Sequence, residues 1–64
     1  MLIQENETYK LSVSIRWLDP EQIEVLITTS NLEKGHWEHR YQSFFMGPEN
    51  LARLSDYIDD TLAR

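Results

Sequence analysis

The chain contains no cysteine, and this absence restricts both its chemistry and its expected environment. Without thiols it has no disulfide, no thiol nucleophile and no thiolate ligand for a metal. A chain without cysteine suits a reducing compartment, so we expect a cytoplasmic protein. Segment 1–7 also lacks the basic residues and the long apolar run of a signal peptide, and no apolar run is long enough to span a membrane. We therefore expect neither export nor a membrane anchor.

Glycine, proline and basic residues are also scarce. Two glycines, two prolines and 41% hydrophobic residues are a globular composition, which argues against disorder. We expect residues 1–64 to form a single small domain, near the lower size limit for folding without disulfides or metal. Six basic residues against eleven acidic ones give a net charge of −5. This charge repels phosphate backbones and anionic membranes, so neither nucleic acid nor a membrane is an expected partner.

Alternating hydrophobicity predicts the first two strands. The clearest strand is 9–17, where one face carries Tyr9, Leu11, Val13, Ile15 and Trp17. The pair Asp19-Pro20 favours a turn, because proline fixes φ at the value that the second turn position needs. A second strand is expected over 23–30, where β-branched residues are frequent. Whether residues 1–4 add a fourth strand is left open by the sequence.

The segment 31–35 is expected to be a loop, because asparagine and glycine tolerate positive φ. A third strand follows over 37–46. One of its faces carries Trp37, His39, Tyr41, Ser43 and Phe45. Phe44 and Met46 lie on the opposite face, where they indicate a bulge or a second contact surface.

A helix is expected over 48–63, since Pro48 suits the first helical position. Its apolar stripe consists of Leu51, Leu54, Ile58 and Leu62. The predicted fold class is α+β: a three-stranded or four-stranded antiparallel β-meander with one C-terminal helix packed on one face. In this packing we expect Leu51 near Trp17, Ile23 and Phe45, and Leu62 near Tyr9 and Trp37. One helix cannot cover so much apolar sheet, which predicts a homodimer.

No catalytic or metal motif stands out. His36 and His39 are three residues apart, and on a strand this spacing points them to opposite faces, so we predict no metal and no cofactor. The chain has no phosphate-binding loop, nucleophile motif or evident carboxylate pair, and we predict that it is not an enzyme. An active site shared across a dimer interface, with His39 and either Tyr41 or an acidic residue as acid and base groups, is the alternative.

The helix end is unusually acidic. Asp56, Asp59 and Asp60 lie where the negative end of the helix dipole makes carboxylates unfavourable. One interpretation is a patch that binds a basic partner; the other is a solvated face neutralised by Arg53 and Arg64. We take these three residues, with Phe44 and Met46, as candidate partner-binding residues.

The order of sheet then helix, with the segment Pro48-Glu49-Asn50-Leu51 and the later Leu54, Ile58, Asp59 and Asp60, loosely resembles a known family. That family is the single-strand-binding transcriptional coactivators of the positive-cofactor-four type. The resemblance implies a dimer that binds single-stranded nucleic acid on a basic, aromatic sheet surface. In this chain Glu24 and Glu38 stand on the outward face instead.

The sequence leads to three functional hypotheses. The first is a small acidic protein-interaction module of bacterial or phage type that regulates or inhibits a larger protein, with aspartates that imitate phosphates. The second is single-strand nucleic-acid binding through the sheet, with Lys10, Arg16 and Arg40 on phosphates and Trp37 or Tyr41 stacked on bases. It needs exposed aromatics, whereas we expect these to lie under the helix. The third is a structural subunit of a larger assembly.

Overall fold

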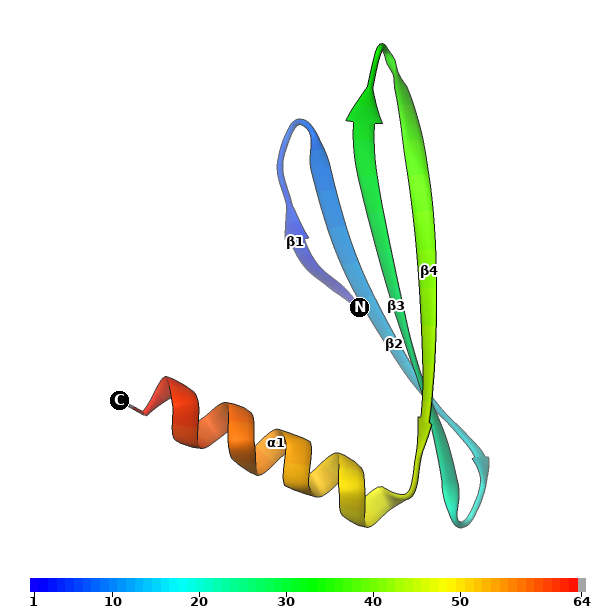
Figure 1. The fold of residues 1–64 in the computed structure, drawn as a ribbon, viewed down its shortest axis with the longest axis vertical. Coiled ribbons are helices and arrows are strands. Elements are labelled where there is room, and N and C mark those ends of the chain that lie inside the picture. The colour runs from blue at the N-terminus through cyan, green and yellow to red at the C-terminus, as the bar shows by residue number, and fades with distance from the viewer. Residues whose placement is uncertain (64) are drawn as a thin grey trace.

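The computed structural model describes residues 1–63, which form one antiparallel sheet followed by one helix (Figure 1). The elements are β1 (Leu2–Glu5), β2 (Tyr9–Asp19), β3 (Gln22–Glu33), β4 (His36–Met46) and α1 (Pro48–Leu62). Each strand pairs with the one before it, so the order in the sheet is β1-β2-β3-β4. The predicted α+β class is confirmed. The N-terminal residues supply a fourth strand, β1, which the sequence alone does not decide.

Local hydrogen bonds explain the first two turns. Between β1 and β2, the Thr8 amide donates to Asn6 Oδ1 at 2.9 Å, and the Asn6 amide donates to the Tyr9 carbonyl at the same distance. Between β2 and β3, the Asp19 carboxylate accepts a bond from the Glu21 amide at 2.7 Å. Such bonds from a side chain to the backbone two residues on are why Asn and Asp favour turns.

The turn between β3 and β4 is shorter than expected. Lys34 has φ of 49° and Gly35 has φ of 84°, and Glu33 pairs directly with His36. Two successive residues with positive φ match the right-handed twist of the flanking strands, so the hairpin closes with only two loop residues. The predicted loop over 31–35 is therefore wrong over 31–33, because these residues belong to β3.

This tight turn fixes which side chains share a face. Val25 pairs with Phe44, and Thr28 pairs with Tyr41. The helix side of the sheet, toward which α1 extends, carries Val13, Ile15, Trp17, Ile23, Val25, Ile27, Phe44 and Met46. The far side carries Lys10, Arg16, Glu24, Leu26, Thr28, Ser30, Trp37, His39, Tyr41 and Phe45. The expectation that Trp37, Tyr41 and Phe45 lie under the helix is therefore wrong, since they lie on the opposite face.

The helix begins where predicted but stands away from the sheet. Gly47 links β4 to Pro48 in an extended conformation, with φ of −74° and ψ of 162°. Proline disfavours helical backbone in the residue before it, so the single linking residue directs α1 outward (Figure 1). No residue of Pro48–Leu62 is buried, and Leu62 is 77% exposed. The expectation that the helix packs closely on the sheet, with Leu51 near Phe45 and Leu62 near Tyr9, is therefore wrong.

The resulting core is small. Only Ile23 and Val25 are buried hydrophobic residues in the described part of the chain, at 3% and 7% exposure. The shortest extent is 14 Å, against 42 Å and 34 Å along the other axes. The radius of gyration is 14.5 Å, whereas a compact chain of this length has about 11 Å. Stable domains usually have two packed layers, and here the second layer is missing over most of the sheet.

Candidate functional site

An apolar wedge lies between the sheet and the helix and is lined by side chains of both. The sheet contributes Val13, Ile15, Val25 and Ile27, and the helix contributes Leu51, Leu54 and Ile58. Ser55 and Asp59 line its border. Alternation along the strands and the spacing of three and four along the helix place all seven side chains toward the same space. The wedge can accept an apolar surface, and its few polar groups lie at its edge.

The structure separates the three candidate aspartates. Asp59 lines the apolar wedge, while Asp56 and Asp60, one turn apart, lie with Glu49 on the outer side of α1. All three are exposed. Within residues 1–63, Arg53 forms no ion pair with Asp56, and the predicted neutralisation by Arg64 lies outside the described residues. The outer side of α1 therefore presents Glu49, Asp56 and Asp60 with Arg53 as the one cation among them in residues 48–63, which leaves a net negative charge facing solvent.

Phe44 and Met46 lie beside the wedge. Phe44 is paired with Val25, and Met46 is paired with Ile23, so both side chains are on the helix side. Phe44 is 46% exposed. The two residues extend the apolar surface of the wedge onto β4, which within residues 1–63 has no strand on its outer edge. They therefore join the sheet residues of the wedge, and the structure places only Asp59 with them among the candidate aspartates.

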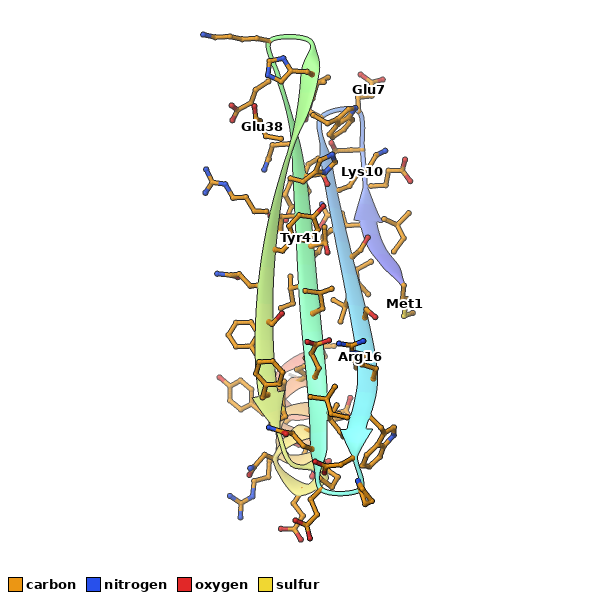
Figure 2. The ribbon with its side chains drawn as sticks, turned by 90° about the vertical axis from the view of Figure 1, so that its right-hand side faces the viewer. Met1, Glu7, Lys10, Arg16, Glu38 and Tyr41 are labelled. Atoms are coloured by element: carbon orange, nitrogen blue, oxygen red, sulfur yellow. The ribbon has the colours of Figure 1, made fainter. Side chains whose placement is uncertain are left out.

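The far side combines cations with exposed aromatic rings. Lys10 Nζ lies 4.7 Å from the centre of the Trp37 ring, a cation–π distance. Arg16 Nε donates to Glu24 Oε1 at 2.8 Å. Figure 2 looks onto this side, with Lys10, Arg16 and Tyr41 spread along it. Tyr41 is 66% exposed.

Arg40, the third cation of the nucleic-acid hypothesis, lies on the helix side. It pairs with Thr29 on β3, whose neighbours on that face are Ile27 and Asn31. The sheet thus places Lys10 and Arg16 on the same face as the aromatics, and Arg40 on the other face. Both far-side cations already have acidic or aromatic neighbours, because Lys10 Nζ is also 4.0 Å from Glu5 Oε1.

Sequence reasoning missed one polar pair between neighbouring strands. Ser30 Oγ lies 2.7 Å from His39 Nδ1, and Ser30 is the buried polar residue of the described chain, at 6% exposure. If a two-residue turn is assumed at Lys34-Gly35, the sequence alone predicts that Ser30 pairs with His39. Within residues 1–63, no carboxylate is hydrogen-bonded to His39, so the pair lacks the group that orients a catalytic base. The bond satisfies a buried hydroxyl and fastens β3 to β4.

The two histidines are held apart. His36 Nε2 lies 3.1 Å from Glu38 Oε1, while His39 bonds Ser30 on the far side. No group of three or more His, Asp or Glu side chains within residues 1–63 is placed to hold a metal ion. The helix of this part of the chain is also too short and too polar to serve as a membrane span.

Comparisons of the chain with protein-family models, with curated proteins and with solved structures give no match. The loose resemblance to the single-strand-binding coactivators gains no support from them.

Proposed function

We propose that the protein is a non-catalytic interaction module that acts in the cytoplasm by binding and regulating a larger protein. The observation that carries this proposal is that far more hydrophobic side chains are exposed than are buried. In residues 1–63, fourteen large hydrophobic side chains are exposed and two hydrophobic residues are buried. Three of the exposed side chains, Ile15, Leu54 and Ile58, line the apolar wedge, and a contiguous apolar surface of this kind is characteristic of protein-binding sites. Within residues 1–63, buried Ser30 contacts an exposed His39 that has no carboxylate partner, so this serine–histidine pair gives no support to a catalytic role.

The outer side of α1 gives the partner a chemical character. Glu49, Asp56 and Asp60 project from one side of an exposed helix without a compensating ion pair within residues 1–63. Carboxylates spaced along a rigid helix can occupy a basic groove in the way that phosphates do. The proposal therefore includes a partner with a cationic groove, such as a nucleic-acid-binding protein.

Neutralising the outer aspartates is expected to weaken this complex. In the variant Asp56→Asn with Asp60→Asn, the partner captured by affinity purification from the native host should bind about tenfold more weakly at low salt. The difference should shrink as salt is added, because screening removes the same attraction. Titration of the captured partner at several salt concentrations measures this.

The matched control is Glu7→Gln with Glu33→Gln, which removes the same charge at the opposite end of the sheet. This control should bind like the parent chain. Unchanged binding by the aspartate variant would eliminate phosphate imitation. If the purification captures no partner, the proposal that the protein is an interaction module is contradicted.

The far side supports nucleic-acid binding as a second candidate function. Tyr41 and Phe45 are exposed there, which that hypothesis requires, and Lys10 and Arg16 share the face. Against it stand the net charge of −5, the engagement of Arg16 by Glu24, and the position of Arg40 on the other face. Each reduces attraction to a phosphate backbone. The interaction module is therefore the better-supported proposal.

An oligonucleotide titration separates the two candidates. We expect no change in tryptophan fluorescence or in the anisotropy of labelled single-stranded or duplex DNA at micromolar protein and low salt. The low-salt condition favours phosphate contacts, so a negative result there is decisive. Saturable binding that is lost in Tyr41→Ala would instead establish the far side as a single-strand site.

A further inference from the structure

The chain carries two apolar surfaces, one on the sheet and one on α1, that do not cover each other. The helix side of the sheet is an apolar face of the kind that a helix covers. The stripe of α1 formed by Leu51, Leu54 and Ile58 is of the kind that packs on an apolar sheet. Leu54 and Ile58 are 43% and 47% exposed, and Ile15 on the sheet is 55% exposed. A surface and its complement within one chain are the elements of a self-complementary, twofold-symmetric contact.

The residue that links the sheet to the helix explains why α1 does not cover the apolar face of its own sheet. Gly47 alone joins β4 to α1, and Pro48 keeps it extended, so the helix leaves the sheet at a steep angle (Figure 1). A short, constrained hinge beside a complementary element is the arrangement that favours exchange of that element between two copies. The helix can then reach the sheet of a neighbouring copy without any change in the hinge.

The exposed area agrees with this arrangement. The chain has an accessible surface of 5483 Å², whereas a compact monomer of 7.6 kDa has about 4,300 Å². The excess is about 1,200 Å² per chain, or about 2,400 Å² for two chains. Obligate homodimers bury about 2,000–5,000 Å² in total. Covering the excess thus requires a contact of the size that a permanent dimer has.

We propose that the occupant of the apolar wedge is a second copy of this chain, in a twofold dimer where each α1 packs on the partner's sheet. The wedge of each copy is then closed by the helix of the other. This arrangement leaves the outer side of α1, with Asp56 and Asp60, and the far side of the sheet free. The dimer covers Ile15, Leu54 and Ile58 of the exposed apolar residues, so the larger partner proposed above would bind the surface that the dimer leaves free. Dimer formation and capture of the larger partner are measured separately, so the failure of one is distinguishable from the failure of the other.

Crosslinking between single-cysteine variants tests the exchange, since the natural chain has no cysteine. Leu54→Cys and Val13→Cys chains, one carrying a mass tag, are unfolded, mixed, refolded and treated with a short bis-maleimide. We expect twice the 7.6 kDa chain mass by light scattering and a covalent product that joins the helix variant to the sheet variant. A monomer at micromolar concentration would overturn the proposal, as would a dimer without this product.

The double variant Leu54→Cys with Val13→Cys checks for closure within one chain. Rapid crosslinking inside a single chain of monomeric mass would show that the helix folds onto its own sheet, which is incompatible with exchange. In the exchanged dimer the same variant should instead be joined across two chains.

A pair of charge-matched substitutions tests the surface itself. Leu54→Asp places a carboxylate in the wedge and should weaken dimerisation by about a hundredfold or more, because an unpaired charge would be buried. Ala52→Asp adds the same charge to an exposed helix position away from the stripe and should leave dimerisation within about threefold of the parent. Equal dimerisation by the two variants would contradict the proposed interface.

Discussion

Replacing Ile23 with alanine is expected to lower the free energy of unfolding by about 3 kcal/mol and the melting temperature by about 15 °C. Ile23 is 3% exposed and lies on the helix side between its register partners Trp17 and Met46. Removing three carbon atoms there leaves a cavity in a very small core. A single core of this chain length supplies about 3–5 kcal/mol, so most of that stability is lost. Thermal unfolding followed by far-ultraviolet circular dichroism measures the effect.

The matched control is Ile3→Ala on the edge strand β1. Ile3 is 52% exposed, so the same loss of carbon atoms should cost less than about 1 kcal/mol. Similar melting temperatures for the two variants would show that Ile23 is not a centre of the core.

A hundredfold dilution is expected to lower the melting temperature by about 10 °C. This follows from the exchanged dimer, because unfolding then releases two chains and its midpoint depends on concentration. The dilution lowers the free energy of unfolding of the dimer by about 2.7 kcal/mol. Dividing this value by the unfolding entropy of two chains of 64 residues gives the shift in melting temperature. Circular dichroism in cells of different path length covers the required range of concentration.

Leu54→Asp provides the comparison for this dilution series. Whatever fold this variant retains should melt at a temperature that does not change with dilution, whereas Ala52→Asp should shift like the parent chain. A constant melting temperature for the parent would mean that folding and association are independent, which contradicts an obligate dimer.

The strands and the helix could be predicted because their periodicities are strong. Alternation over 9–17 and the spacing from Leu51 to Leu62 each indicate one type of element. The structure places both where expected, as β2 and α1. β1 could not be decided from sequence, because a four-residue strand carries little pattern and depends on pairing with Ser12, Leu11 and Lys10.

The faces of the last strand were predicted wrongly for one identifiable reason. A loop over 31–35 leaves the register free, and the aromatics at 37, 41 and 45 then appear to belong to the core. The turn at Lys34-Gly35 sets the register, and a shift of one residue moves every side chain to the other face. Lys34 gave no signal, since lysine rarely adopts the positive φ that it has here.

The candidate site was only partly accessible to sequence reasoning for the same kind of reason. The stripe on α1 predicted that the helix would bind an apolar face, and the wedge contains both. The distance of α1 from the sheet depends on the backbone conformation of Gly47. No pattern in the sequence indicates the direction in which this residue turns the chain. The aspartates were grouped by proximity in sequence, whereas the helical turn separates Asp59 from Asp56 and Asp60.

The ends of α1 are weakly stabilised. Gly47 provides no side-chain cap at its start, and no basic residue lies in the last turn within Pro48–Leu62, where Asp59 and Asp60 meet the negative dipole end. An isolated helix of fifteen residues with such ends melts readily in water. Amide hydrogens of this segment would therefore exchange with solvent at rates near those of a free peptide until another surface holds them, and their protection directly reports how much of the protein is assembled.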